Sequence, residues 1–374
     1  MKEAVANLLR EDLRGRTPYG APQLDVPVRL NTNENSYAVP ADVVDAIVAS
    51  VAETARHLNR YPDREFTRLR EALAAYLRSQ TGVGIAPEQV WAGNGSNEVL
   101  LHLVQAFGGV GRTALGFTPA YSMHPIITRT TGTTWVDGLR GTTSGLFELD
   151  GDLAVRQVRR HRPHVVFLCS PNNPTGTALD LDVVEAVVAA APESLVVVDE
   201  AYAEFARPGT PSVMTLLDGR PLLVVTRTMS KAFALAGARI GYLAADPDLV
   251  DALRLVRMPY HLSDPTQAVA LAALRHDANL LATVEAIKRQ RDRIVAELEA
   301  IGYPPVASDA NFVLFGGLED EHATWQALLD EGILVRDVGL AHYLRVTAGT
   351  PAETDAFLAA MGRLATTHRQ EQSA

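Results

Sequence analysis

The stretch Leu222–Arg239, LLVVTRTMSKAFALAGAR, decides both the fold and the chemistry expected of this chain. It opens with an apolar run typical of a buried β-strand, and Lys231 follows among hydroxyl-bearing and small side chains. A lysine in such a place can be desolvated, which lowers its pKa and makes its amine a usable nucleophile. The hydroxyls of Thr228 and Ser230, with the guanidinium of Arg239, would suit a phosphate group. A nucleophilic lysine beside a phosphate site indicates pyridoxal phosphate as the cofactor.

Similar apolar runs recur on both sides of this stretch, and each is followed by polar side chains. We expect further strands at 90–92, 113–117, 133–137, 165–169, 195–198 and 240–244. Apolar runs that alternate with helices are typical of an α/β fold, here a mostly parallel seven-stranded sheet flanked by helices. In such sheets ligands bind beyond the carboxyl ends of the strands. We therefore expect one site to gather the polar residues that follow the strands.

Four of these polar residues match the needs of a pyridoxal ring. Asp199 could keep the ring nitrogen protonated, and that ion pair makes the ring an electron sink. Asn173 and Tyr202 can hydrogen-bond the phenolic oxygen, and Tyr121 can stack on the face of the ring. Each residue alone also suits a turn, a cap or a packing contact. Their recurrence at the ends of separate strands favours a shared site.

A second phosphate contact is expected where the run 90–92 leads through a glycine-rich turn, 93–95, into a helix. This arrangement presents free backbone N–H groups to an anion. Ser96 and Asn97 are therefore expected to bind the cofactor phosphate together with the hydroxyls and the arginine of the lysine stretch. The turn is neither a G-x-G-x-x-G nucleotide loop nor a G-x-S-x-G hydrolase elbow, because Asn97 and Glu98 follow Ser96.

The pattern changes after about residue 260. A long helix is expected over 280–301, with short strands near 312–315, 333–335 and 343–346, which together indicate a smaller α+β domain. Near the other end, glycine and proline are dense at 14–22, so we expect an irregular arm that lies over the body. The predicted organisation is an N-terminal arm at 1–35, a large domain at 36–260 and a small C-terminal domain at 261–374.

Composition excludes several classes of function. The 374 residues have a net charge of −10, which argues against a nucleic-acid partner. The longest apolar runs fall well short of the roughly 18 residues that span a membrane, so no membrane partner is expected. The ten histidines are scattered without metal-ligand spacing, so no metal is expected either. With one cysteine, Cys169, no internal disulfide can form, and a reducing, cytoplasmic location is expected.

The chain resembles the fold-type I pyridoxal-phosphate aminotransferases in three motifs: SPNNPTG at 170–176, DEAY at 199–202 and TMSKAF at 228–233. Within that class it is similar to the histidinol-phosphate aminotransferases in four others: LNTNEN at 30–35, RYPD at 60–63, GNGSNE at 93–98 and LRVT at 344–347. It resembles their actinobacterial branch in RGRTPYGAP at 14–22 and FTPAYSMH at 117–124. The resemblance runs from about residue 12 to 361. It departs at Ser36-Tyr37, where the family usually has proline.

The resemblance implies that the cofactor is held as an aldimine on Lys231, which later carries a proton between the substrate α-carbon and the cofactor. Asp199 and Tyr202 would assist in catalysis. Tyr61 would reach the cofactor phosphate of a neighbouring subunit, so the resemblance also implies a homodimer with shared active sites.

The resemblance further implies a substrate pair of small molecules, histidinol phosphate and glutamate. Tyr19, Asn33 and Arg336 would contact the substrate, the arginine at its phosphate, and Arg345 would bind the α-carboxylate of glutamate. The reaction implied is reversible amino transfer between L-glutamate and imidazole acetol phosphate, giving L-histidinol phosphate and 2-oxoglutarate in histidine biosynthesis. Arg336 and Arg345 together suit this reaction, because one site must bind the phosphate of one substrate and the carboxylate of the other in turn, and a guanidinium can bind either anion.

Three alternatives compete with this interpretation. A hydrolase could use Lys231 as a base for Ser230, but it would leave Asp199, Asn173 and Arg239 without a role. A non-catalytic cofactor-binding regulator would normally carry a basic DNA-binding module, and the sequence contains none. An aromatic amino-acid aminotransferase shares nearly every motif and is the main alternative within the enzyme class.

Overall fold

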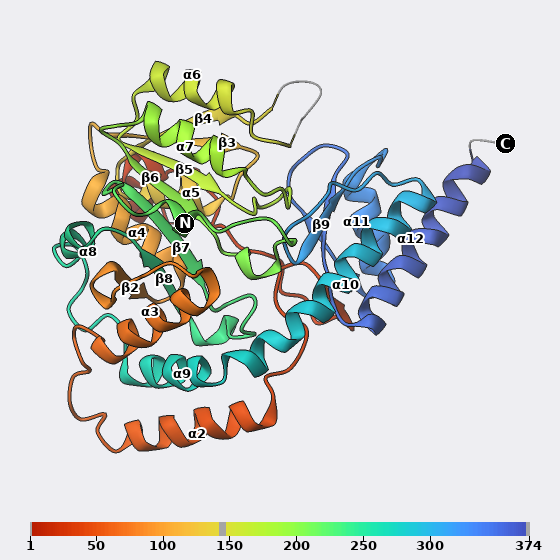
Figure 1. Cartoon of the computed structure of the whole chain (residues 1–374). Helices are drawn as coiled ribbons and strands as arrows, with labels where there is room; N and C mark the ends of the chain where they lie inside the picture. The colour runs from red at the N-terminus through yellow and green to blue at the C-terminus, as the bar shows by residue number, and fades with distance from the viewer. Residues whose placement is uncertain (1, 142–146, 372–374) are drawn as a thin grey trace.

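The computed structural model describes residues 2–141 and 147–371 as two lobes, with the helix α10 (Asp277–Ile301) running from one to the other (Figure 1). The large lobe contains the chain from about residue 36 to 276. The small lobe contains the C-terminal part and a short strand from the N-terminal segment. This is the predicted α/β architecture with its smaller α+β unit.

The large lobe is built on a seven-stranded sheet in the order β2-β8-β7-β6-β5-β3-β4. Its strands are β2 (Val90–Gly93), β3 (Thr113–Thr118), β4 (Thr134–Leu139), β5 (Val165–Cys169), β6 (Leu195–Asp199), β7 (Leu223–Thr228) and β8 (Gly241–Ala244). Of these seven strands, β8 alone runs in the direction opposite to the others. Every residue of β5 and β6 is buried, as expected when helices cover both faces of a parallel sheet. The prediction of a mostly parallel sheet is confirmed.

Helices surround this sheet: α2 (Ala41–Ala55), α3 (Thr67–Thr81), α4 (Ser96–Phe107), α5 (Met123–Thr130), α6 (Gly151–His161), α7 (Leu181–Ala190), α8 (Pro247–Leu253) and α9 (Asp264–Arg275). Side-chain caps fix several helix starts. Asp150 accepts a hydrogen bond from the Leu153 N–H at the start of α6, and Ser263 accepts one from Thr266 at the start of α9. Among the described residues, no helix is both long and apolar enough to cross a membrane.

The small lobe contains an antiparallel sheet in the order β11-β12-β9, covered by helices (Figure 1). Its elements are β9 (Phe312–Phe315), α11 (Glu321–Asp330), β11 (Arg336–Asp337), β12 (Leu344–Thr347) and α12 (Pro351–Glu371). Beside this sheet, the N-terminal strand β1 (Val28–Arg29) pairs in parallel with β10 (Ile333–Leu334). The N-terminal segment therefore joins the small lobe although more than 300 residues separate the two strands in sequence.

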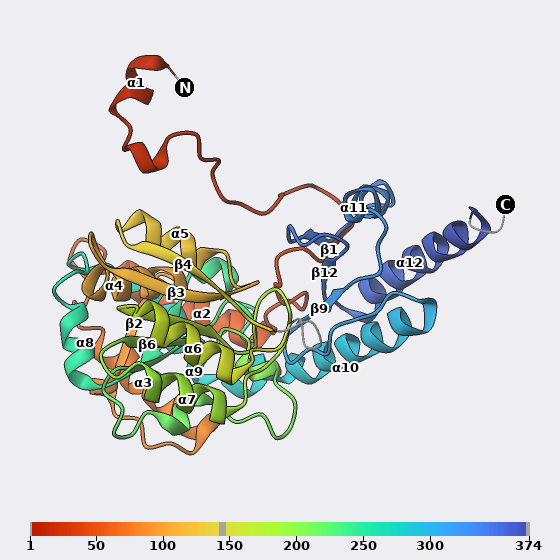
Figure 2. The same cartoon turned by 90° about the horizontal axis from the view of Figure 1, so that it is seen from above.

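The expected arm lies over the body only in part. The Pro22 carbonyl accepts a hydrogen bond from Asn31 Nδ2, whereas the earlier part of the chain, which contains α1 (Glu3–Leu8), does not lie over the body. It projects outward beyond α5 (Figure 2), and its apolar side chains Val5 and Leu8 are exposed. Arg10 donates a hydrogen bond to the carbonyl of Thr130 at the end of α5. Because neither helical turn of this segment buries a side chain, there is little to hold it against its own chain.

We propose one adjustment to the predicted division at residue 260. Helix α9 follows this point, yet it packs against α2 and α3 of the large lobe. The next helix, α10, packs against α12 and β9 of the small lobe. The passage between lobes therefore falls near residue 276, at the start of α10, rather than at 260.

Candidate active site

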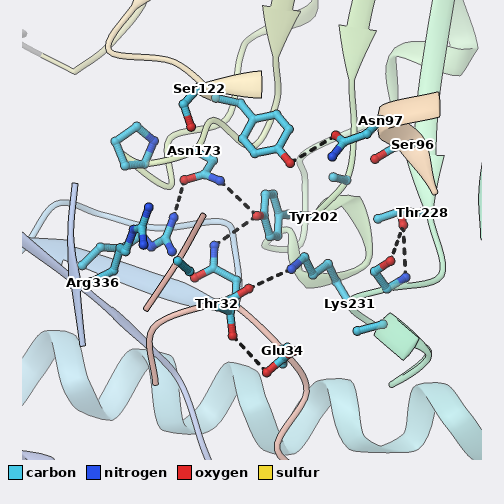
Figure 3. A pocket seen from close by; sticks show the side chains of 18 of the residues that line it. Thr32, Glu34, Ser96, Asn97, Ser122, Asn173, Tyr202, Thr228, Lys231 and Arg336 are labelled. Atoms are coloured by element: carbon cyan, nitrogen blue, oxygen red, sulfur yellow. Dashed lines mark hydrogen bonds between the residues drawn. The ribbon is translucent and has the colours of Figure 1, made fainter. Parts of the chain in front are cut away.

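A cavity of about 550 Å³ opens at the carboxyl ends of the parallel strands, where the two lobes meet. Residues from both lobes and from the N-terminal segment line it (Figure 3). It gathers all but one of the residues predicted for the site, namely Tyr19, Asn33, Ser96, Asn97, Tyr121, Asn173, Asp199, Tyr202, Thr228, Ser230, Lys231, Arg239, Arg336 and Arg345.

Lys231 lies three residues beyond the end of β7, and its side chain reaches into the cavity (Figure 3). Its Nζ donates a hydrogen bond to the Thr32 carbonyl oxygen at 2.9 Å. Burial, together with the nearby charges of Arg345 and Arg239, lowers the pKa of Lys231 to about 8, and Glu34 opposes part of this shift. An amine with this pKa is partly unprotonated near neutral pH, so it can attack an aldehyde carbon.

Asp199 is buried at the end of β6, at the floor of the cavity. Its Oδ2 lies 3.2 Å from His124 Nε2, and its Oδ1 accepts hydrogen bonds from Thr226 Oγ1 at 3.3 Å and from the Ala201 N–H at 3.2 Å. These partners fix the orientation of a carboxylate that faces the interior of the site. A positively charged ring nitrogen would compensate its charge.

His124 is a site residue that the sequence analysis missed. Its ring is buried, stacks on Phe167 with centroids 4.8 Å apart, and meets the Tyr121 ring edge-on at 5.4 Å. Tyr121 precedes α5, and the His124 N–H donates to the Tyr121 carbonyl at 3.0 Å, so one turn brings the two residues together. The spacing of three residues could have indicated this, because a turn joins residues three apart. His124 is also the last residue of the motif FTPAYSMH at 117–124.

The Tyr202 hydroxyl lies at the centre of a chain of hydrogen bonds (Figure 3). It accepts from Asn33 Nδ2 at 3.0 Å and from Asn173 Nδ2 at 3.2 Å. Asn173 Oδ1 in turn accepts from Arg345 Nη1 at 2.5 Å. Burial raises the pKa of Tyr202 to about 12, so the hydroxyl keeps its proton at pH 7. Since both amides donate to its oxygen, that proton can be donated to a bound ligand.

The glycine turn, the start of α4 and Arg239 together form an anion cradle. Gly95 has φ of +83°, and a side chain there would place its Cβ 2.4 Å from Arg239 Nη2. A Cβ on Gly241 would lie 2.0 Å from the Ser96 nitrogen, so β8 can approach the turn only through a glycine. Arg239 Nη1 also lies 3.4 Å from Ser230 Oγ. Helix N–H groups, a guanidinium and hydroxyls thus converge where a phosphate could bind.

Arg336 and Arg345 line the wall that the small lobe contributes. They are direct register partners in the antiparallel pair β11–β12, so their side chains lie on the same face of the sheet. Burial lowers the pKa of Arg345 to about 10, which leaves it charged at pH 7. Its Nε is buried without a hydrogen-bond partner among the described residues. The Tyr19 ring lies against Arg336, with the Cζ atom 6.0 Å from the ring centroid.

Tyr61 is the one predicted residue that does not line this cavity. Its side chain is 79% exposed and stacks on Tyr260 with ring centroids 4.4 Å apart. Tyr260, the partner in this ring pair, does not line the cavity either. Tyr61 therefore lies outside the cavity of its own chain.

The loop at Ser36-Tyr37, where the resemblance led us to expect proline, is held by Asn35 instead. The Asn35 Oδ1 accepts from the Tyr37 N–H at 2.9 Å, and its Nδ2 donates to Thr283 Oγ1 on α10 at 3.0 Å. These bonds connect the loop to the helix between the lobes. The loop is therefore anchored by side-chain hydrogen bonds in the position where a proline would stiffen it.

These residues fit pyridoxal phosphate. One cavity is lined by a lysine amine, a buried carboxylate, a hydroxyl network and an anion cradle, which are the groups that this cofactor needs. Such a fold and site define a pyridoxal-phosphate-dependent aminotransferase.

Comparisons with known proteins agree with this assignment to the aminotransferases. The family model for aminotransferase class I and II matches residues 26–361. Similar proteins include the histidinol-phosphate aminotransferases of Paenarthrobacter aurescens, 62% identical over 95% of this chain and 94% of that protein, and of Thermobifida fusca, 58% identical over 95% and 96%. The chain belongs to the class I and II aminotransferases and, within them, to the histidinol-phosphate aminotransferases.

A solved structure shows the same likeness in three dimensions. The crystal structure of the histidinol-phosphate aminotransferase from Sinorhizobium meliloti, in complex with pyridoxal-5'-phosphate, has a TM-score of 0.81 and 26% identity to this chain. The match covers 91% of this chain and 92% of that one. The residues that line the cavity of the present chain would fit the cofactor bound in that structure.

Proposed function

We propose that this enzyme catalyses the reversible transfer of an amino group between L-glutamate and imidazole acetol phosphate, giving L-histidinol phosphate and 2-oxoglutarate. This is a step of histidine biosynthesis. Its relatives at 58–62% identity carry the name of that activity.

The observation that carries this proposal is the pairing of Arg336 with Arg345. Like charges directly opposite each other in a sheet are destabilising. Here the guanidinium of Arg345 is buried, and its Nε has no hydrogen-bond partner among the residues that the structure describes. A bound anion removes that penalty. A phosphate or a carboxylate could occupy the same place in turn, because a guanidinium binds either in a bidentate geometry.

The other site residues have the following proposed roles. When bound, pyridoxal phosphate supplies an electron sink and carries the amino group between the two half-reactions. Asp199, held by His124, would keep the ring nitrogen protonated, and Tyr202 would donate its proton to the phenolic oxygen. The Lys231 amine takes the proton from the substrate α-carbon. The phosphate would be bound by Ser96, Asn97, Thr228, Ser230 and Arg239, with Tyr121 over the ring and Tyr19 and Asn33 near the substrate.

The proposal predicts that L-histidinol phosphate is a better amino donor than phenylalanine, with kcat/KM higher by about 10²-fold or more, because the paired arginines lose their phosphate partner with the other donor. Steady-state kinetics with both donors would measure this. Histidinol without its phosphate serves as the matched control and should be as poor as phenylalanine. A higher kcat/KM for phenylalanine would instead make the enzyme an aromatic amino-acid aminotransferase.

We also propose that two copies of the chain form a homodimer with shared active sites. Tyr61 and Tyr260 form an exposed ring pair, and Leu255 and Met258, from the same segment as Tyr260, are also exposed. Exposed apolar side chains gathered in this way are typical of an interface. The outward projection of the N-terminal segment in Figure 2 would let it reach the other copy. With one cysteine, which is buried and free, we place the enzyme in the cytoplasm.

The dimer proposal predicts subunit complementation between Lys231→Ala and Tyr61→Ala. Each variant alone should be strongly impaired. Dimers that exchange subunits in an equal mixture should regain about a quarter of wild-type activity, because half of them are hybrids and each hybrid has one intact site. Sedimentation should give twice the chain mass of 40.3 kDa. A monomer, or a mixture no more active than the average of the two variants, would contradict shared sites.

A further inference from the structure

Glu98 poses a physical problem at the phosphate cradle. It occupies the third residue of α4, immediately after Ser96 and Asn97, whose N–H groups would bind the cofactor phosphate. A carboxylate so close to a phosphate dianion repels it. The nearby imidazoles do not neutralise this charge, because burial lowers the pKa of His102 to about 4 and also lowers that of His261. The carboxylate must therefore contribute something that outweighs the repulsion.

The hydrogen bonds of the Glu98 carboxylate indicate what it contributes. Glu98 Oε2 accepts two hydrogen bonds from Asn94, from the backbone N–H at 2.6 Å and from Nδ2 at 2.8 Å. Asn94 Nδ2 also donates to the His261 carbonyl at 2.9 Å, and His261 Nε2 lies 2.9 Å from the Ala92 carbonyl oxygen. Asn94 is thus held on one side by the carboxylate and on the other by the segment that carries Tyr260.

Close packing on both sides restricts the movement of the glycine turn at 93–96. A Cβ on Gly93 would lie 3.1 Å from Glu98 Oε2, whereas Gly95 lies against Arg239 and Ser96 against Gly241. The turn at 93–96 is therefore confined between the carboxylate and the guanidinium. If the carboxylate released Asn94, the turn could move away from Arg239 and the N–H groups of α4 would no longer converge with it.

We propose that Glu98 is a positioning residue, which acts through Asn94 to hold the turn at 93–96 in the shape that binds the cofactor phosphate. The inference rests on the phosphate site of the proposed function. The two charge-assisted hydrogen bonds from Asn94 to the Glu98 carboxylate set the geometry of the cradle. Their contribution to phosphate binding outweighs the repulsion between the carboxylate and the phosphate.

The test compares two ligands in the cofactor-free, full-length enzyme: pyridoxal 5'-phosphate and pyridoxal, which lacks the phosphate. Both react with Lys231, so the ratio of their Kd values isolates the cradle. In Glu98→Gln, which keeps the shape but loses the charge, Kd for the phosphorylated ligand should rise about tenfold while Kd for pyridoxal stays unchanged. Asn94→Ala should have the same effect. The double variant should be no worse than either single one, because both residues act through one contact.

Glu88→Gln is the matched control, because it removes the same charge from an exposed position outside the cradle and should leave the ratio unchanged. An unchanged ratio in Glu98→Gln would overturn the proposal, and so would tighter binding of the phosphate, which would mean that repulsion dominates. Additive effects of the two substitutions would also overturn it. Failure of the cradle itself is distinguishable, since wild-type enzyme would then bind both ligands equally well.

Discussion

Lys231→Ala is expected to lower kcat for transamination by at least about 10⁴-fold, because covalent capture of the cofactor and proton transfer at the substrate are lost together. The substitution removes an amine whose pKa burial lowers to about 8 and whose Nζ is oriented by the Thr32 carbonyl. The carboxylate of Asp199 and the anion cradle remain. The cofactor should therefore still bind, but without the visible absorption of the lysine-bound form.

The covalent link can be mapped because the chain contains only three lysines, Lys2, Lys231 and Lys288. After borohydride reduction of the wild-type enzyme and proteolysis, mass spectrometry should find the cofactor on Lys231 alone. Lys288→Ala is the control; Lys288 pairs with Glu285 at 2.8 Å outside the cavity, so this variant should keep wild-type kcat. Label on another lysine, or more than about a hundredth of kcat in Lys231→Ala, would contradict the assignment.

The large sheet and the cofactor residues could be predicted because their signals are local. The runs at 165–169 and 195–198 are apolar throughout, as strands buried on both faces must be. Parallel strands also end at the same edge of a sheet, so residues that follow them meet whatever their distance in sequence. Asp199, Asn173 and Lys231 come together for this reason.

Features that depend on tertiary contact could not be predicted in the same way. The strand β11 has only two residues, so nothing local indicates that Arg336 pairs with Arg345 in register. The small residues of α9 suit either lobe, and only packing against α2 and α3 assigns them to the large one. The density of glycine and proline at 14–22 predicts an irregular arm but does not indicate what the residues before it contact. Those residues project outward, since none of the described residues from 2 to 13 has a buried side chain.

Asp199→Asn is expected to lower kcat by about 10²–10⁴-fold while the cofactor still becomes attached to Lys231. The amide has the shape of the carboxylate and can accept from Thr226 and from the Ala201 N–H. It carries no charge, so it cannot hold a proton on the ring nitrogen, and the ring then withdraws electrons from the substrate α-carbon far less. Asp180→Asn, at the exposed start of α7, removes the same charge away from the site and should leave kcat unchanged.

A loss of activity in Asp199→Asn could also come from a misplaced ring, and a cofactor analogue separates the two causes. Pyridoxal phosphate methylated on its ring nitrogen carries a permanent positive charge and needs no proton there. If the carboxylate acts through charge, this analogue should restore at least about tenfold in kcat to the variant. It should not raise the kcat of the wild-type enzyme. An equal loss with both cofactors would instead mean that Asp199, fixed by His124 at 3.2 Å, serves mainly to place the ring.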